Sequence, residues 1–325
     1  MCGIVGIWDF SQRSRSDNLR ENVQNMAAAL RHRGPDDEGI YLDPNSCLAL
    51  AHRRLSVIDL SDQGHQPMIS SCGRFTIVYN GEIYNTSELA DKLVRRGRRF
   101  RGHSDTEVLL EGCAEYGIEE FIPHVNGIFA FALYDSASRS LWLCRDRMGV
   151  KPLYYGIVGD CLLFGSELKA LIRHRDFPRQ INHAAVAAFL QNNYVPGDCS
   201  IYKGVGKATP GALLRFAEDG QSRSVTYWSL ASVVRKGVAK PITQPDEAQA
   251  RLEDLLQDAV KRQMISDVPL GGLLSGGIDS SLVVSMMQRA SSCPVETFTI
   301  GFKERDFDES RYAAAVAERL GTQHH

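Results

Sequence analysis

No apolar run in this 325-residue sequence reaches the roughly 18–20 residues that a membrane-spanning helix needs. The N-terminus also lacks the basic segment and hydrophobic core of a signal peptide. The formal net charge is only −2 and the pI is about 6.5, so no excess of positive charge is available to bind nucleic acid. We therefore expect a cytoplasmic protein with neither a membrane nor a nucleic acid as its partner.

None of the eight cysteines forms a Cys-x-x-Cys pair, and most lie in apolar, strand-like sequence such as residues 141–144. This distribution argues against a zinc site and against a disulfide framework. His324 and His325 end the sequence, but neighbours in sequence seldom face one ion, and no cysteine or aspartate is spaced to join them. Reduced thiols of a cytosolic protein are the simplest interpretation.

What the sequence does have begins at Cys2, directly after the initiator methionine. Removal of Met1 would leave an α-amine and a thiol on the same residue. The amine titrates close to neutral pH, so it can serve as the base for the thiol. A nucleophile and its general base would then lie in one residue, although Cys2 alone is better explained as an ordinary second residue.

Short strand-like segments and paired helices alternate over the first two thirds of the chain. This pattern predicts an antiparallel α+β layer structure. Strands are expected at residues 2–8, 47–51, 55–59, 75–79, 127–135, 140–145, 153–157, 161–166 and 211–216, and helices at 17–31, 86–96, 104–116 and 182–191.

Asn80 and Gly81 follow one of these strands directly and have two interpretations. Asn-Gly after a β-rich run is typical of a hairpin turn. An asparagine amide next to a glycine N–H is also a good pair of donors for an oxyanion. The residues alone leave both open.

A different pattern follows residues 218–245, which are polar, contain proline and are expected to be a linker. Asp246 is expected to cap an amphipathic helix. A strand at 268–274, a helix to about residue 290, a strand at 295–302 and a helix at 308–320 then give the order β-α-β-α. This order is the opening of a parallel, doubly wound sheet.

The segment Ser275–Ser281 lies between the first of these strands and its helix. Its glycines let the backbone approach a ligand, and free N–H groups at a helix N-terminus attract phosphate oxygens. Asp279 could hold Mg²⁺ beside them. The segment is neither a Walker A loop nor a G-x-G-x-x-G fingerprint, and a turn that binds nothing is the alternative.

Six motifs, taken in order, resemble those of glutamine-dependent asparagine synthetases with an N-terminal class II glutamine amidotransferase domain, an N-terminal nucleophile (Ntn) hydrolase. They are MCGI at 1–4, RHRGPD at 31–36, RLSVID at 54–59, NGEIYN at 80–85, SD at 104–105 and SGGIDSS at 275–281. Each motif is modest alone, but six in the family's order are specific.

The resemblance implies that Cys2 attacks the side-chain amide of glutamine, giving a thioester and ammonia, with Asn80 and Gly81 as the oxyanion hole. It also implies that Arg54 pairs with the α-carboxylate and that Glu82 and Asp105 hold the α-amine. The glutamine-binding residues are then Arg54, Val57 and Ile58 through their backbone, Asn80, Gly81, Glu82 and Asp105.

In the second domain, the resemblance implies that ammonia arriving through the interior reacts with a carboxylate that ATP has adenylated. With aspartate as the acceptor, the products are asparagine, AMP and pyrophosphate. The implied ATP-binding residues are Leu273, Ser275, Gly276, Gly277, Asp279, Ser280 and Ile300, with Mg²⁺ at Asp279.

The implied fold is a four-layer αββα sandwich with two antiparallel sheets over residues 2–217. Residues 218–245 would be the linker, and residues 246–325 the start of an α/β, HUP-like nucleotide-binding domain. The family's acceptor-binding residues would lie beyond residue 325. We therefore expect a truncated second domain and a chain that hydrolyses glutamine without completing the synthetase reaction.

Two alternatives and the oligomeric state remain open. A related amidotransferase could aminate a sugar acid or a peptide, and the acceptor pocket that would decide this is absent from the sequence. A non-catalytic remnant is the other alternative, although the intact Cys2, Arg54, Asn80, Gly81 and Asp105 argue against it. A homodimer is compatible with either enzyme.

Overall fold

The computed structural model describes residues 1–325, apart from the side chain of Arg305. The chain divides into two compact units, residues 1–234 and 235–325.

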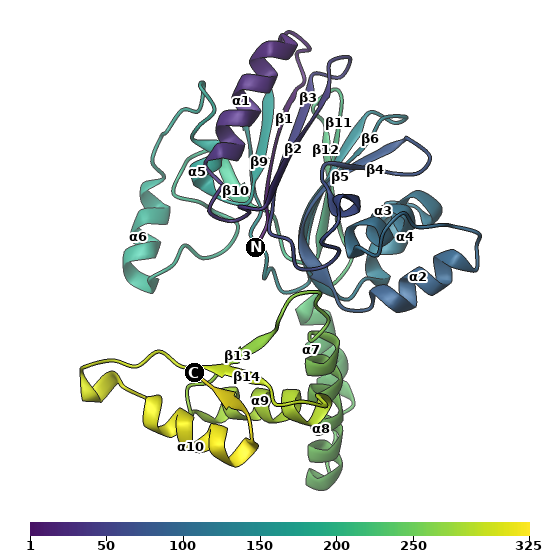
Figure 1. Ribbon diagram of the computed structural model, residues 1–325. Coiled ribbons are helices and arrows are strands. Elements are labelled where there is room, and N and C mark those ends of the chain that lie inside the picture. The colour runs from purple at the N-terminus through teal and green to yellow at the C-terminus, as the bar shows by residue number, and fades with distance from the viewer. The chain divides into compact units, whose positions relative to one another are not determined.

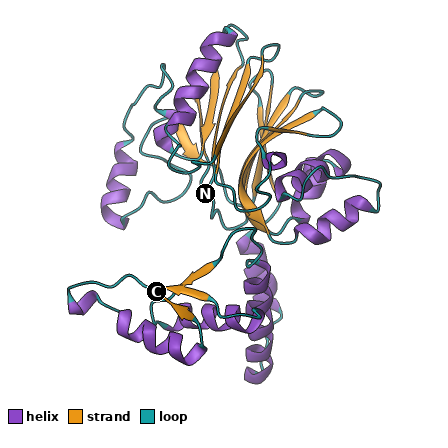
Figure 2. Ribbon diagram, in the orientation of Figure 1, coloured by secondary structure: helices purple, strands orange, loops and turns teal.

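Two six-stranded antiparallel sheets form the centre of the first unit (Figures 1 and 2). In order across the first sheet, the strands are β10 (Val205–Lys207), β8 (Tyr154–Val158), β9 (Cys161–Gly165), β1 (Gly3–Asp9), β3 (Leu48–Arg54) and β2 (Asp37–Asp43). Across the second they are β12 (Ser222–Thr226), β11 (Ala212–Ala217), β7 (Ser140–Arg145), β6 (Gly127–Asp135), β5 (Phe75–Ile83) and β4 (Met68–Ile69).

Helices cover the outer face of each sheet. Helices α1 (Ser16–Ala28) and α5 (Leu168–Leu171) pack on the first sheet, and α2 (Thr86–Val94), α3 (Asp105–Tyr116) and α4 (Ile118–Phe121) pack on the second (Figure 1). Strand β1 is buried along its whole length because its side chains alternate between two cores. Val5 and Ile7 face α1, whereas Ile4 and Trp8 join the core between the sheets. The predicted αββα sandwich is confirmed.

The helix caps agree with the sequence. The hydroxyl of Ser104 accepts from the amide of Glu107 at the start of α3, and the side chain of Asn182 accepts from the amide of Ala185 at the start of α6 (His183–Asn192). Two short 3₁₀ helices, η1 (Asp62–Gly64) and η2 (Ile122–His124), complete the connections of this unit.

One strand predicted for the first unit is wrong, and the structure adds detail to two other expectations. Residues 55–59 form an irregular loop that ends at Asp59, whose φ of 56° is incompatible with a strand. Asn80 and Gly81 are no hairpin tip, because β5 continues to Ile83 in register with β6. The segment 218–245, expected as a linker, contains β12, which pairs with β11, and α7 (Leu230–Ala239). Strand β12 is an exposed edge strand, which accounts for its polar composition.

The second unit has a parallel sheet in the order β13 (Gly271–Leu273), β14 (Glu296–Phe298) and β15 (Gln323–His324). Its helices are α8 (Pro245–Arg262), α9 (Ile278–Ala290) and α10 (Ser310–Leu320), with the short η3 (Arg305–Phe307) before α10. The β-α-β-α order is confirmed, but the strands are shorter than predicted and there are three of them. The N-cap of α8 is Gln244, so Asp246 lies in its first turn.

The described residues add three observations. All eight cysteines are free. No helix in this part of the chain is both long and apolar enough to cross a membrane. No group of three histidine, cysteine or acidic side chains is arranged to hold a metal ion in the described structure, His324 and His325 included.

Candidate active site

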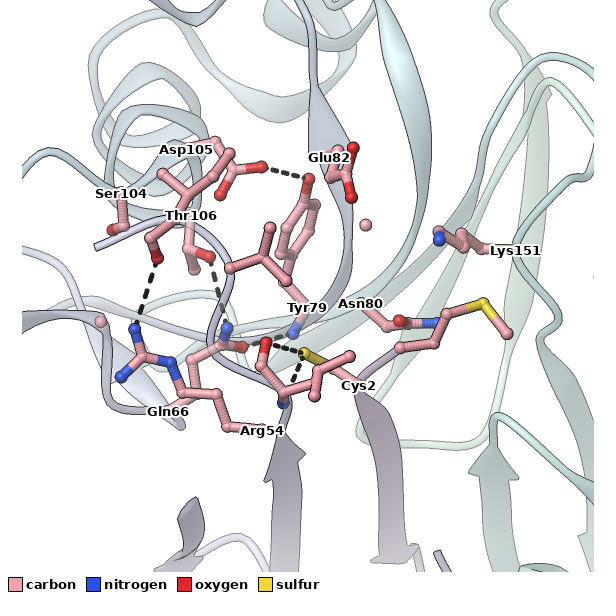
Figure 3. A pocket seen from close by; sticks show the side chains of 16 residues that line it. Cys2, Arg54, Gln66, Tyr79, Asn80, Glu82, Ser104, Asp105, Thr106 and Lys151 are labelled. Carbon is pink, nitrogen blue, oxygen red and sulfur yellow. Dashed lines mark hydrogen bonds between the residues drawn. The ribbon is translucent and has the colours of Figure 1, made fainter. Parts of the chain in front are cut away.

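A cavity of about 200 Å³ lies beside the N-terminal end of β1 (Figure 3). It brings together every first-domain site residue that the sequence predicted. The residues that line it are Met1, Cys2, Arg54, Leu55, Val57, Ile58, Gly64, Gln66, Tyr79, Asn80, Gly81, Glu82, Ser104, Asp105, Thr106 and Lys151.

Cys2 immediately precedes β1, which lies between β3 and β9. Its Sγ accepts from the amide nitrogen of Leu55 at 3.4 Å and lies 3.7 Å from the Leu55 carbonyl oxygen. Nε of Arg33 donates to the Cys2 carbonyl oxygen at 2.9 Å, and Glu167 holds the same guanidinium through Nη1 at 2.8 Å. Cys2 is therefore fixed on both its side-chain and its backbone side.

Burial raises the pKa of the Cys2 thiol, although the hydrogen bond from Leu55 opposes this effect. The thiol is therefore protonated at neutral pH and needs a base. Burial also lowers the pKa of the terminal amine, which belongs to Met1 in this structure, and the positive charges of Lys151 and Arg33 act in the same direction. The surroundings of the N-terminus thus favour a neutral, proton-accepting amine.

Gly81 presents its N–H group to the cavity. Its partner in β6 is Phe129, whose amide donates to Oδ2 of Asp146 and whose carbonyl accepts from the Asp146 amide. These groups of Phe129 point away from β5, so Gly81 and Phe129 are a non-hydrogen-bonded pair. The N–H of Gly81 therefore points away from β6, toward the edge of β5 that lines the cavity.

Asn80 supplies a second hydrogen-bond donor next to the N–H of Gly81. Its side chain is buried, and its Nδ2 has no hydrogen-bond partner among the described residues. A buried polar group without a partner costs free energy, so its retention needs a reason. Two donors that line the same cavity as Cys2 make an arrangement that can stabilise an oxyanion.

Asp105, the first residue of α3, lies at another wall of the cavity. Its Oδ2 accepts from the hydroxyl of Tyr79 at 2.7 Å and from the amide of Ile83 at 3.0 Å. Burial raises the pKa of Asp105 to about 6, against the effect of both hydrogen bonds, and the charge of Glu82 adds to the rise. The carboxylates of Asp105 and Glu82 near one wall of the cavity suit the binding of an ammonium group.

The side chain of Arg54 is almost fully buried where β3 ends. Nη1 donates to the carbonyl oxygen of Ser61 at 3.0 Å, and Nη2 donates to the carbonyl oxygens of Asp59 and Ile58. These bonds use three of the five N–H donors of the guanidinium. Arg54 therefore holds the loop 55–64 in place, which the sequence did not predict, and it has donors left for a ligand.

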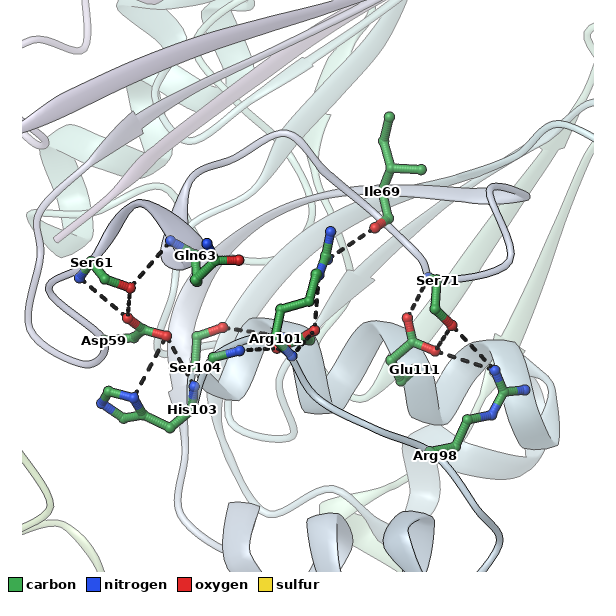
Figure 4. Close-up of polar contacts among 12 residues, drawn as sticks. Asp59, Ser61, Gln63, Ile69, Ser71, Arg98, Arg101, His103, Ser104 and Glu111 are labelled. Carbon is green, nitrogen blue, oxygen red and sulfur yellow. Dashed lines mark hydrogen bonds and ion pairs between the residues drawn. The ribbon is translucent and has the colours of Figure 1, made fainter.

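Asp59 joins this loop to the segment before α3 (Figure 4). One carboxylate oxygen accepts from Ser61, and the other accepts from the amide of His103 at 2.9 Å. Burial acts against ionisation, but these hydrogen bonds lower the pKa of Asp59. The carboxylate of Glu107 accepts from the amides of Arg101 and Gly102. The loop 55–64 and the segment that leads into α3, which both line the cavity, are thus fixed to each other.

Eight lining residues were not predicted as site residues, namely Met1, Leu55, Gly64 and five others. Gln66 and Thr106 are buried, and Nε2 of Gln66 donates to Oγ1 of Thr106 at 3.3 Å. Lys151 lies on the side of Glu82 (Figure 3), with its backbone amide held by the buried carboxylate of Asp146. The other two are Tyr79 and Ser104. Gln66 and Lys151 lie outside the six motifs, so no spacing signal joins them to the site. Tyr79, Ser104 and Thr106 each adjoin a predicted site residue in the sequence.

The second unit places Ser275–Ser281 where β13 ends and α9 begins. Oγ of Ser280 accepts from the amide of Ser275, and Oγ of Ser275 accepts from the amide of Gly277. Gly276 has a φ of 79°, and a Cβ there would lie 2.7 Å from Cβ of Tyr312. The loop therefore has the predicted position at a helix N-terminus, with Asp279 exposed in the first turn.

The comparison with protein families now decides the classification. A model of the glutamine amidotransferase domain matches residues 1–228. The chain belongs to this family. The model of asparagine synthase matches residues 251–325, so this amidotransferase carries sequence of a second family in its second unit.

Curated relatives agree with this classification. Asparagine synthetase (glutamine-hydrolyzing) 3 of Bacillus subtilis is 35% identical over all of this chain and 54% of its own length. Asparagine synthetase (glutamine-hydrolyzing) 1 of the same organism is 34% identical over 99% of this chain and 49% of its own length. The chain thus spans about half the length of these relatives. The resemblance inferred from the six motifs is confirmed at the level of the family.

A solved structure supports the fold alone. Glutamine phosphoribosylpyrophosphate amidotransferase from Bacillus subtilis, complexed with ADP and GMP, aligns with 100% of this chain and 65% of its own. The TM-score is 0.50 and the sequence identity 17%.

Proposed function

We propose that the first unit hydrolyses glutamine, with Cys2 as the nucleophile once Met1 is removed. The observation that carries this proposal is the pair of donors, Nδ2 of Asn80 and the N–H of Gly81, in the cavity that Cys2 also lines. An unpartnered buried amide is costly in the resting protein but useful where negative charge develops during a reaction.

The reaction begins when the Cys2 amine takes the thiol proton and Sγ attacks the amide carbon of the glutamine side chain. The carbonyl oxygen becomes an oxyanion that accepts from Asn80 and Gly81. The amine then returns its proton to the leaving nitrogen, so ammonia departs and a thioester remains. Water attacks the thioester in the same way, releasing glutamate and restoring the thiol.

The α-ammonium and α-carboxylate groups of glutamine would bind at the cavity wall opposite Cys2. Asp105 and Glu82 would bind the α-ammonium, and the donors of Arg54 left by its loop contacts would bind the α-carboxylate. The backbone of Val57 and Ile58 would line the same site. In this assignment, each charged group of glutamine is paired with a side chain of opposite charge.

For the second unit we propose ATP binding at Ser275–Ser280, with Leu273 and Ile300 as exposed flanking contacts. ATP would activate the carboxylate of aspartate, which ammonia would convert to asparagine. Asp279 offers one carboxylate, which suits Mg²⁺ because this ion is usually held by one or two carboxylates together with substrate phosphates. The proposal includes the cytoplasmic location, since eight free thiols suit a reducing compartment.

The test measures glutamate release from glutamine by the 325-residue chain, with AMP formation after addition of ATP and aspartate assayed separately. Intact-mass analysis shows whether Met1 has been removed. A diazoketone analogue of glutamine is expected to label Cys2 once. Glutamate release with a labelled Cys2 supports the proposal. Retained Met1 with no glutamate release contradicts it.

A further inference from the structure

Strand β5 continues well beyond its short neighbour β4. The two residues of β4, Met68 and Ile69, pair with Ile77 and Thr76 only. Past Ile77, side chains hold the backbone groups of Tyr79 and the amide of Ile83 on this edge of β5. Backbone groups of a strand alternate in direction, so residues 79, 81 and 83 share this edge.

Tyr79 has both of its backbone groups held in this way. Its amide donates to Oε1 of Gln66 at 2.7 Å, and its carbonyl oxygen lies 2.9 Å from Nε2 of His52. Farther along the edge, the amide of Ile83 donates to Asp105. Gly81 lies between them, and its N–H faces the cavity.

The two side chains that hold Tyr79 are themselves fixed. Gln66 is 4% exposed, and its Nε2 donates to Thr106, so its Oε1 is the atom that faces Tyr79. His52 is 1% exposed on β3. Its Nε2 must carry the hydrogen, because the partner is a carbonyl oxygen. Burial lowers the pKa of His52 to about 3, so the ring is neutral at working pH.

We propose that Gln66 and His52 are positioning residues for the oxyanion site, and this inference rests on the proposed function. They act through Tyr79, the residue directly before Asn80, and take the place that β4 would fill if it were longer. The edge of β5 therefore stays straight and open at Gly81. Without these two bonds, β5 is held at Tyr79 from the β6 side alone, so the Asn80 amide and the Gly81 N–H can shift out of line.

The variants that test this inference remove one hydrogen bond each. Gln66→Met keeps the length of the side chain but has no acceptor for the Tyr79 amide. His52→Phe keeps a ring but has no donor for the Tyr79 carbonyl. Gln66→Glu keeps the acceptor and serves as the conservative variant. Gln63→Met, at an exposed glutamine of η1, is the matched control.

The kinetics of glutamine hydrolysis distinguish a positioning role from a general loss of structure. The oxyanion forms only after Cys2 has attacked, so a displaced oxyanion donor lowers kcat and leaves glutamine binding unchanged. We expect kcat to fall about 10–100-fold in Gln66→Met and in His52→Phe, with KM within about twofold of the wild-type value. Gln66→Glu is expected to recover most of kcat, and Gln63→Met to equal the wild type. Circular dichroism and thermal melting check that each variant folds.

A second measurement uses glutamate γ-semialdehyde. The Cys2 thiol adds across its carbonyl, sulfur to carbon and proton to oxygen, so the oxygen occupies the oxyanion site. Inhibition by the aldehyde is expected to weaken by the same factor as kcat, whereas inhibition by L-glutamate stays unchanged.

Equal kcat values in the wild type, Gln66→Met and His52→Phe overturn the inference, and so does a parallel loss of aldehyde and glutamate binding. If a methionine at position 66 prevents folding, His52→Phe decides by the same criteria. If the wild type itself releases no glutamate, the proposed function fails instead.

Discussion

The hydroxyl of Tyr79 donates a 2.7 Å hydrogen bond to Oδ2 of Asp105, so one strand carries both the proposed oxyanion donors and a support for the proposed ammonium-binding carboxylate. The same oxygen accepts from the amide of Ile83, four residues along β5. Burial nevertheless raises the pKa of Asp105 to about 6. The ionisation of this carboxylate therefore falls within an accessible pH range.

The first prediction concerns the pH dependence of glutamine binding. KM for glutamine is expected to rise below pH 6, because a protonated Asp105 cannot pair with the α-ammonium. Tyr79→Phe removes a hydrogen bond that favours the ionised form, so the rise is expected to begin higher, by on the order of half to one pH unit. The measurement is KM between pH 5 and pH 8.

Tyr134→Phe is the control, because Tyr134 is another buried tyrosine whose hydroxyl bonds Ser46 and Asp43 instead. Its KM profile should match that of the wild type. A Tyr79→Phe profile that also matches the wild type would show that this hydrogen bond does not tune Asp105.

The second prediction is that Asp105 lowers the stability of the fold. Its folded pKa of about 6 lies above the ordinary 3.8, so the folded protein binds this proton more tightly than the unfolded chain. The protonated Asp105 carboxyl therefore adds to the free energy of unfolding at low pH, and this contribution is lost as pH rises through about 6. Asp105→Asn is expected to raise the free energy of unfolding at pH 7.5 by on the order of 1–3 kcal/mol.

Urea denaturation at pH 7.5 and pH 4 measures this effect, and the difference between variant and wild type should shrink at pH 4. KM for glutamine should increase at least about tenfold in the same variant. A variant less stable than the wild type at pH 7.5 would contradict the sign.

The third prediction concerns the loop 55–64. Asp59→Ala removes the carboxylate that ties this loop to His103, so the backbone of Val57 and Ile58 loses its fixed position. We expect KM for glutamine to rise about 5–50-fold with a smaller change in kcat. Asp62→Ala, at an exposed position in η1, should leave both constants unchanged. A loss confined to kcat would argue that the loop does not shape the binding site.

The fourth prediction concerns Gly81. A Cβ at this position would lie 2.4 Å from the carbonyl oxygen of Ile128 and 2.6 Å from Cβ of Phe129. Gly81→Ala must therefore separate β5 from β6, and we expect a loss of about 1–3 kcal/mol in stability and at least tenfold in kcat. In contrast, Gly237→Ala meets nothing within 4 Å in α7 and should be neutral or slightly stabilising. Urea unfolding and steady-state kinetics distinguish the two.

The sequence predicted the antiparallel layer structure because the relevant signals are local, whereas the αββα sandwich and the role of Cys2 were implied by the resemblance to a family, and the role of Cys2 stays a prediction. Strands β6 and β7 were predicted with the observed bounds, since their apolar runs are bordered by turns. The helix at Asp105 was predicted because Ser104 and Glu107 are a capping box within four residues.

Features that depend on pairing between distant segments could not be predicted in this way. Asn80 and Gly81 have low strand propensity, but nine residue pairs between β5 and β6 hold them in a strand. The pairing therefore decides between a turn and an oxyanion site. The contacts of Tyr79 with Gln66 and His52 span 13 and 27 residues, and only the fold brings them together.

The central claim is that Cys2 is the nucleophile of a glutaminase, and the rate of ammonia release by Cys2→Ser tests it most directly. A hydroxyl keeps the shape of the side chain but is a far weaker nucleophile than a thiol at neutral pH. The account predicts a fall of at least about 100-fold in kcat, with the fold intact by thermal melting. Ammonia release at the wild-type rate would contradict it.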